Sequence, residues 1–396
     1  MYGTLEVLGP EHEFSVVNEN LQPLPIVDKV IRQIHGRVVN NVNMGKFAFG
    51  KELQAHVLEF KATEPFHSPQ VFEETIQEAV QTILALLEKR HAKLLGLGMH
   101  PTLQLNDARI WTHRDRQIYE ALNRIFNLKQ HGWLNIQSFQ LNLSYKNEKE
   151  AIKLHNTLNR ILPYLPAIAA SSPIFETKIG DFTDNRLHFY STNQRQVPSI
   201  TGDIIPEHVN SLEEYEKTTV KRYSDDLCKL RAPRCLLNKK WLNSRGAVIR
   251  PDRKAIEIRT LDEQECVKSD VALSCFIRAI LRGMMEDEST SAILHETLVQ
   301  NLNRTIKSGF DAHVQDAYGQ TAKQVCKHLL KIAHENANAE EKKYLPLIKQ
   351  RIDNGNLSQM ILRDINKKTQ KTDMQEAIFD VYSSLANCLT NNRVYA

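Results

Sequence analysis

Four short apolar stretches of the chain each carry two charged or amide residues two positions apart. The pairs are Glu11/Glu13, Glu59/Lys61, Gln140/Asn142 and Glu257/Arg259. Residues two apart in a strand point to the same face of a sheet, so each stretch predicts a strand with one apolar and one polar face. For any single pair, a face of the sheet turned to water is an equally good explanation. Four such strands together favour a shared site, because a buried carboxylate costs free energy unless it is paired or binds a metal.

The residue types in these pairs indicate a particular chemistry. Carboxylate oxygens from several strands around one concavity suit Mg²⁺, which binds through a few carboxylates and the phosphates of a nucleotide. An arginine beside them can hold phosphate oxygens with two parallel hydrogen bonds. The pattern therefore predicts a site for a nucleotide and its metal ion.

The remaining pattern predicts an α+β protein in which helices outnumber strands. Hydrophobic alternation predicts strands over residues 4–17, 55–63, 92–99 and 135–145, and a hairpin over 246–250 and 255–259. Ser68 followed by Pro69 predicts the start of a helix that runs to about residue 93, and Asn147 is expected to cap another. Further helices are predicted over 212–226, 268–285, 289–306 and 321–336, whereas 178–206 is polar and predicted to be a loop.

Composition narrows the possible partners. The chain has 51 Lys and Arg against 47 Asp and Glu, a net charge of +4, so no nucleic-acid partner is expected. Its six cysteines form no Cys-x-x-Cys motif, and no apolar run approaches the ~20 residues of a membrane span. We therefore expect a cytoplasmic protein with no membrane partner. A homo-oligomer is compatible with this expectation.

Several motifs, taken in order, resemble the glutamate–cysteine ligase type 2 (carboxylate–amine ligase) family of the glutamine synthetase-like superfamily. They are Gly9-Pro-Glu-His-Glu13, Glu52 and Glu59 with six residues between them, Gly98-Met-His-Pro101, Phe139-Gln-Leu-Asn142, Ala169-Ala-Ser-Ser-Pro173, Asn185-Arg186, Ile249-Arg-Pro251 and Ile256-Glu-Ile-Arg259. Each motif alone is weak, but the ordered set is fairly specific. It covers residues 8 to about 262, roughly two thirds of the chain.

The resemblance implies a curved antiparallel sheet that forms an active-site funnel and is flanked by helices. Residues 1–265 would form the catalytic region, and residues 266–396 a helical part packed on the same domain. It also implies an ATP- and Mg²⁺-dependent ligase that joins a carboxylate, typically the γ-carboxyl of glutamate, to an amine through an acyl phosphate.

The resemblance further assigns roles to single residues. The implied metal ligands are Glu11, Glu13, Glu52, Glu59, Glu257 and Gln140. The implied catalytic residues are Arg259, Arg186 and Glu59. The implied nucleotide-binding residues are Arg250, Arg259, Arg186 and Asn142. Among the arginines, Arg245 or Arg253 could take the place of Arg250.

One position departs from the family pattern. Relatives usually carry a histidine where this chain has Gln140, two residues before Asn142. An amide oxygen is still a ligand that a hard cation accepts, so we expect the oxygen of Gln140 to face Glu13 and Glu257. The departure keeps two alternatives open: another phosphoryl-transfer enzyme of the same superfamily, such as a guanidino-type kinase, and a nucleotide-binding homologue without turnover.

Overall fold

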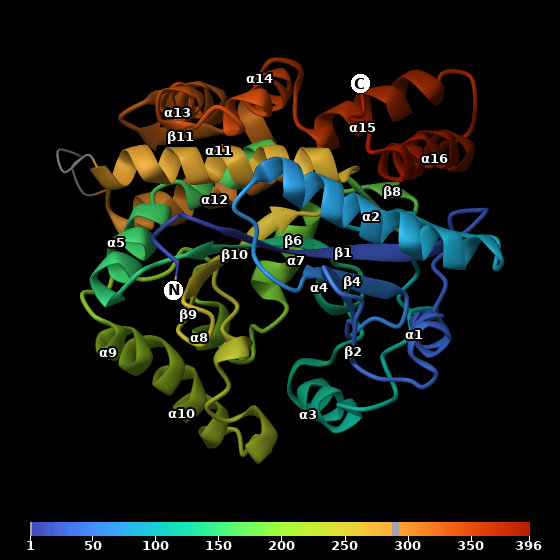
Figure 1. Ribbon diagram of the computed structural model, residues 1–396, viewed down its shortest axis with the longest axis horizontal. Coiled ribbons are helices and arrows are strands. Elements are labelled where there is room, and N and C mark those ends of the chain that lie inside the picture. Colours follow the sequence, from blue (N-terminus) through green and yellow to red (C-terminus); the bar gives the residue numbers. More distant parts are fainter. Residues whose placement is uncertain (1, 287–292) are drawn as a thin grey trace.

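An eight-stranded antiparallel sheet forms the centre of the protein, whose computed structural model describes residues 2–286 and 293–396 (Figure 1). The strand order is β2–β3–β4–β1–β6–β10–β9, and β5 also pairs with β1. The strands are β1 (Leu8–Asn18), β2 (Asn41–Asn43), β3 (Phe47–Lys51), β4 (Val57–Ala62), β5 (Ala92–Leu95), β6 (Ser138–Ser144), β9 (Ala247–Arg250) and β10 (Ala255–Asp262). Two small hairpins lie outside it: β7 (Ile174–Phe175) with β8 (Lys178–Ile179), and β11 (His313–Asp316) with β12 (Gly319–Thr321).

Helices cover both sides of this sheet. In Figure 1, α2 and α11 lie along one face with α13 to α16 beyond them, and α3, α9 and α10 lie on the opposite side. The helices are α1 (Val27–His35), α2 (Pro69–Glu88), α3 (Arg116–Phe126), α4 (His131–Leu134), α5 (Glu148–Leu158), α6 (Leu165–Ala169), α7 (Asn185–Thr192), α8 (Pro198–Thr201), α9 (Leu212–Tyr215), α10 (Arg222–Lys229), α11 (Val267–Glu286), α12 (His295–Ser308), α13 (Ala322–Asn336), α14 (Leu345–Asn354), α15 (Leu357–Lys368) and α16 (Met374–Asn391). The fold is thus α+β with an antiparallel sheet flanked by helices, as predicted.

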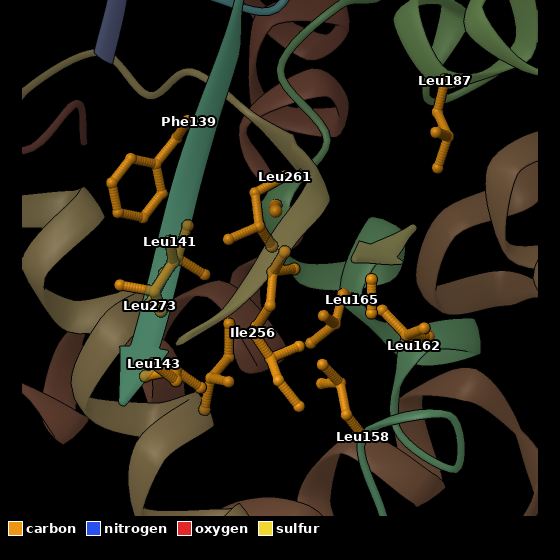
Figure 2. Packing of buried hydrophobic residues seen from close by; sticks show 14 of the residues in the cluster. Phe139, Leu141, Leu143, Leu158, Leu162, Leu165, Leu187, Ile256, Leu261 and Leu273 are labelled. Atoms are coloured by element: carbon orange, nitrogen blue, oxygen red, sulfur yellow. The ribbon is translucent and has the colours of Figure 1, made fainter. Parts of the chain in front are cut away.

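Alternation along the strands gives the sheet an apolar face that forms the main core. Phe14, Phe139, Leu141 and Ile256 are fully buried on this face. Figure 2 shows the side chains of β6 and β10 packed with Leu273 of α11 and with leucines from the segment around α5 and α6. The polar residues between them must point the other way. The core therefore fixes which face of the sheet carries the charges.

The helices after residue 265 belong to the same hydrophobic core. Helix α11 contacts α2, α5, α13 and α14, and one cluster of buried apolar residues extends from Leu5 to Leu389. A second cluster joins β5 to α15 and α16. The predicted division at residue 265 stays a prediction. In the part of the chain that the structure describes, no helix combines the length and apolar character needed to cross a bilayer.

Capping residues in the sequence predicted the starts of two helices correctly. Helix α2 begins at Pro69, and the side chain of Ser68 accepts a hydrogen bond from the Val71 amide. Asn147 caps α5 in the same way through the amide of Glu150. Such caps supply partners for amides at the start of a helix that otherwise have none.

The prediction of a loop over residues 178–206 was wrong. This segment contains α7 and α8. The buried residues of α7 are Asn185, Arg186 and Leu187, so two of the three are polar and no apolar stripe marks the helix. The helix predicted over 289–306 begins at His295, and its first residues, 289–292, lie outside the described part of the chain.

A buried ion pair allows a test of how much the contacts of the C-terminal helices with the core contribute to the free energy of unfolding. Arg278 of α11 lies 2.5 Å from the Glu341 carboxylate, and both side chains are almost completely buried. We expect Glu341→Gln to lower the free energy of unfolding by about 3 kcal/mol, because it leaves the guanidinium buried without a counter-charge. Asp353→Asn, which breaks an exposed pair with Lys349, should change it by less than about 1 kcal/mol. Urea denaturation of both variants measures this, and equal midpoints would contradict the expectation.

Candidate active site

The polar face of the sheet brings together carboxylates from three strands, β1, β4 and β10, and amide side chains from β6. Glu11 lies opposite Lys61 on β4 and opposite Gln140 on β6, and Glu13 lies opposite Glu59. Glu257 lies opposite Asn142. The members of each pair therefore share a face, and the exposed fractions of the four glutamates are only 1–8%. Four of the five carboxylates predicted to bind metal thus come from one face of the sheet and are largely removed from water.

Arginines from the β9–β10 hairpin compensate the charge of Glu257. Arg250 Nη1 lies 2.5 Å from Glu257 Oε2, and Arg259 Nη2 lies 2.6 Å from Oε1. Arg253, in the turn of the hairpin, lies 3.7 Å from Glu257 and also contacts the carboxylate of Glu11. A carboxylate buried to this extent needs such partners. Glu257 is therefore the best compensated carboxylate of the group.

Lys61 and Arg253 stabilise the ionised form of Glu11. Burial would raise the pKa of Glu11, but the cations of Lys61 and Arg253 outweigh it and lower that pKa to about 2. Lys61 also lies 2.5 Å from Glu59. For Glu59, burial dominates over Lys61, and its pKa is raised well above the ordinary value. One lysine is therefore shared by two carboxylates. Only for Glu11 do the neighbouring cations outweigh the effect of burial on the pKa.

Glu13 and Glu52 form no ion pair with Lys or Arg among the described residues, which distinguishes them from the other carboxylates. Glu13 accepts hydrogen bonds from the Ser138 amide (2.7 Å) and from the Gln140 side chain (3.1 Å). Glu52 follows β3 and is half-buried. Burial raises the pKa of each to about 7, and the neighbouring carboxylates add to the shift. Cationic compensation is therefore weakest at these two positions.

The Gln140 side chain is oriented differently from the expectation. Its amide nitrogen, rather than its oxygen, faces Glu13, and it also contacts the Ser138 hydroxyl at 3.3 Å. Without a metal ion, a carboxylate next to an amide attracts the N–H side of that amide. A half-turn of the amide group exchanges the two atoms, so the nitrogen seen here does not remove Gln140 from the ligand set.

Three of the sequence motifs meet at Asp262, at the end of β10. Arg186 Nε lies 2.5 Å from Asp262 Oδ1, and the Ser171 amide donates to Oδ2 at 2.8 Å. Gly98 lies directly against this carboxylate: a Cβ at that position would come within 2.3 Å of Asp262 Cγ. The motifs containing Gly98, Ser171 and Arg186 therefore share one task, which is to fix the Arg186–Asp262 pair.

Sequence reasoning missed Asp262 and a second acidic group on the far side of the sheet. His12 Nδ1 lies 3.0 Å from Glu263 Oε1 and 3.5 Å from Asp270 Oδ2, and all three side chains are fully buried. Burial lowers the pKa of His12, but Glu263 and Asp270 outweigh it and raise that pKa to about 9. Glu263 also accepts a hydrogen bond from the backbone amide of Glu13 at 2.9 Å. The acidic residues directly after β10 were the available signal.

Two hollows lie on the polar face. The first, of about 270 Å³, is lined by Glu13, Glu52, Gln140, Arg186 and Arg259 together with Trp133, and is called the Trp133 hollow below. The second, of about 340 Å³, is lined by Glu11, Lys61, Asn142 and Arg253 together with Tyr2, and is called the Lys61 hollow. The predicted site residues that line a hollow are therefore divided between two spaces rather than one cavity, and Glu59 and Glu257 line neither of them.

Two of the arginines considered from the sequence line neither hollow. Arg250 is engaged by Glu257 and lies 3.5 Å from Asp252. Arg245 is fully buried, and its Nε and Nη2 donate to the Glu207 carboxylate at 2.6 and 2.7 Å. Arg245 is therefore a structural residue. Arg253 lines the Lys61 hollow, which makes it the better placed substitute for Arg250.

Known proteins resemble this chain in sequence and in structure. An uncharacterized protein of Archaeoglobus fulgidus is 44% identical over 389 residues, which cover 98% of this chain and all of that protein. A putative glutamate–cysteine ligase 2-1 of Rubrobacter xylanophilus is 24% identical over 77% of this chain and 74% of its own length. The crystal structure of a glutamate–cysteine ligase from Francisella tularensis in complex with AMP has the same fold, with a TM-score of 0.69 and 13% identity over 98% of this chain and 90% of that chain.

The family comparison extends beyond the motifs recognised in the sequence. The model of glutamate–cysteine ligase family 2 matches residues 7–384, which include most of the helical part after residue 265. The C-terminal helices are thus within the matched region, although no motif in them was recognised. From this match over nearly its whole length, the chain belongs to glutamate–cysteine ligase family 2.

Proposed function

We propose that the protein is an ATP- and Mg²⁺-dependent ligase that joins the γ-carboxyl of glutamate to an amine. The observation that carries the proposal is the cluster of four largely buried carboxylates on one face of the sheet with the half-buried Glu52 beside them, bordered by Arg186, Arg253 and Arg259. Family membership supports the same reaction class.

The donor set fits magnesium. The ligands would be Glu11, Glu13, Glu52, Glu59 and Glu257, with Gln140 as an amide donor. These groups offer oxygen, which Mg²⁺ prefers, and no thiol or imidazole is among the residues lining either hollow. Crowded carboxylates with raised pKa values are a site where a divalent cation relieves repulsion. When bound, the metal would neutralise phosphate oxygens and the charge that develops during phosphoryl transfer.

The two hollows suit different substrates. The Lys61 hollow combines two cations with an apolar rim that includes Tyr2, Val7 and Pro10, which fits a nucleotide base and its phosphates. The Trp133 hollow contains Arg186 and Arg259 and would hold the carboxylate and the amine. The γ-phosphate of ATP would then lie where the two spaces adjoin, within reach of Arg259.

The reaction would proceed in two steps. A carboxylate oxygen of the substrate attacks the γ-phosphorus, the bond from that phosphorus to the β,γ-bridging oxygen breaks, and ADP leaves with the electron pair. The amine nitrogen, after losing one proton, attacks the acyl carbon, and inorganic phosphate leaves with the C–O bonding pair. The nitrogen loses a second proton as the amide forms. Arg259 and Arg186 would stabilise the charge on the transferred phosphoryl group and keep it in line.

Hydroxylamine tests the acyl phosphate directly. With protein, ATP, Mg²⁺, glutamate and hydroxylamine, we expect γ-glutamyl hydroxamate and an equal amount of inorganic phosphate. Hydroxamate measured as its ferric complex, with ADP and phosphate measured alongside, checks this balance. A stable phosphorylated product would instead indicate a kinase. ATP binding by calorimetry without any ADP would indicate a homologue that has lost turnover.

Glu52→Gln separates chemistry from folding. Glu52 makes no ion pair among the described residues, and burial already raises its pKa to about 7, so removing its charge should not destabilise the fold. We expect the rate of hydroxamate formation to fall by about 100-fold, because one oxygen ligand of the metal loses its charge. Glu335→Gln, at an exposed position of α13, should retain the full rate. A Glu52→Gln variant with the normal rate would remove this residue from the proposed site.

Variants of residue 140 test the departure from the family pattern. Gln140→His should keep or strengthen nucleotide binding that depends on Mg²⁺, since relatives carry histidine there. Gln140→Leu should weaken it, because an apolar group offers the cation nothing in place of water. Nucleotide affinity measured against Mg²⁺ concentration compares the three proteins. Identical curves would mean that residue 140 does not contact the metal.

A further inference from the structure

We infer that His12, Glu263 and Asp270 form a structural site for a divalent transition-metal ion, and that Zn²⁺ is the ion their donor atoms fit best. The site lies on the apolar face of the sheet, on the other side from the carboxylates to which the proposed function assigns Mg²⁺. It does not depend on that function, because none of the three residues lines either hollow. Three observations support it: the spacing of the donor atoms, the unused oxygens of Asp270, and the balance of charge.

The donor atoms have a spacing close to that of a tetrahedral metal site. His12 Nδ1 lies 3.0 Å from Glu263 Oε1 and 3.5 Å from Asp270 Oδ2. When Zn²⁺ is bound by nitrogen and oxygen at about 2.0–2.1 Å, neighbouring ligand atoms of the tetrahedron are about 3.3–3.4 Å apart. The two distances lie on either side of this length, and one donor atom from each residue can be chosen so that all three are within 4.8 Å of one another. Rotation of the carboxylates would therefore bring all three residues onto one ion.

Asp270 is the member of this group whose side chain lacks a hydrogen bond. Both of its carboxylate oxygens are buried, and neither has a hydrogen-bond partner among the described residues. Buried polar atoms are nearly always hydrogen-bonded, so two unused oxygens on one side chain need an explanation. Glu263 differs, because its Oε1 faces His12 and its Oε2 accepts a hydrogen bond from the Glu13 amide. If both oxygens of Asp270 bind the ion, His12 and Glu263 complete a set of four donor atoms.

The charges of the group are also unbalanced. Two carboxylates face one imidazole, and no Lys or Arg among the described residues forms an ion pair with any of the three side chains. Arg278, about two turns further along α11, is engaged by Glu341. A protonated imidazole would leave one negative charge in excess, which is costly in a buried group. A divalent cation bound to a neutral imidazole and two carboxylates leaves no net charge.

The surroundings suit an ion that stays bound. The imidazole of His12 stacks on Phe139 and Phe14, with ring centroids 4.9 and 5.6 Å away, and this packing fixes the direction of Nδ1. All three ligands are fully buried, and a closed set of nitrogen and oxygen donors is typical of structural zinc. The ion would tie β1 to the segment after β10 and to the first turn of α11. Through Glu263 it would also hold the backbone of Glu13.

The metal content of the full-length protein tests this site. Protein without a histidine tag, from cells grown with added Zn²⁺, is dialysed against EDTA and then against Mg²⁺, and its metals are measured by inductively coupled plasma mass spectrometry. We expect about one zinc ion per chain to remain, because the ligands are closed to solvent. X-ray absorption at the zinc edge should show one imidazole nitrogen, oxygen ligands and no sulfur. Zinc on the polar face would lack the imidazole, since no histidine among the described residues lines either hollow.

A variant of Asp270 separates this site from other zinc-binding groups. Asp270→Asn keeps the shape of the side chain but removes a charged ligand, so zinc content should fall at least about 10-fold. For the wild type, Tm should be about 5 °C higher after growth with zinc than after growth in zinc-depleted medium, because the ion binds only the folded chain. For Asp270→Asn, the two Tm values should agree. His91→Gln, which removes an exposed histidine beside Glu19, is the matched control and should behave as the wild type.

Three results would overturn the inference. They are wild-type protein that retains no zinc, retained zinc without an imidazole ligand, and full zinc content in folded Asp270→Asn. If Asp270→Asn does not fold, the metal content and the X-ray absorption spectrum of the wild type decide the matter by themselves.

Discussion

Removing several carboxylates from water on one side of a sheet is the constraint on which the rest of this structure depends. Each buried carboxylate requires either a cation or protonation. Lys61 and the arginines of the β9–β10 hairpin meet this requirement for Glu11 and Glu257. Among the described residues, no Lys or Arg forms an ion pair with Glu13 or Glu52, and burial raises the pKa values of both. The position of the uncompensated charge is therefore set by how far the cations of β4 and of the β9–β10 hairpin can reach.

The apolar face of the sheet is also involved in positioning the site. His12 lies between Glu11 and Glu13 in sequence but points to the opposite face, where it meets Glu263 and Asp270. Through the Glu13 amide, Glu263 ties the strand to the segment that leads into α11. The last register pair between β1 and β6 is His12 with Phe139. At the next residue, Glu13, the backbone amide donates to the Glu263 side chain instead of to β6. Glu263 therefore contacts the buried His12 and also holds the backbone of the site residue Glu13.

The sequence predicted the sheet and its acidic face well because both depend on local alternation. A period of two places Glu11 with Glu13, and Gln140 with Asn142, whatever the tertiary fold. Helix α7 was missed because its burial is driven by an ion pair: Arg186 is buried against Asp262, 76 residues away. The pairing of Arg253 with Glu11 spans 242 residues, and no local pattern contains such information. The division into two hollows was equally inaccessible, since it depends on where the helices cover the sheet.

The walls of the Trp133 hollow have a consequence for how such a protein can diverge. They are built from short helices and turns outside the sheet, which include Leu122 and Trp241, whereas the acidic floor belongs to strands whose register fixes the whole core. A one-residue slip in β1 would exchange its apolar and acidic faces and lose both core and site. Changes at Leu122 or Trp241 carry no such penalty for register. Mutational drift can therefore reshape the space above the floor in single steps, while the floor itself is inherited as a unit.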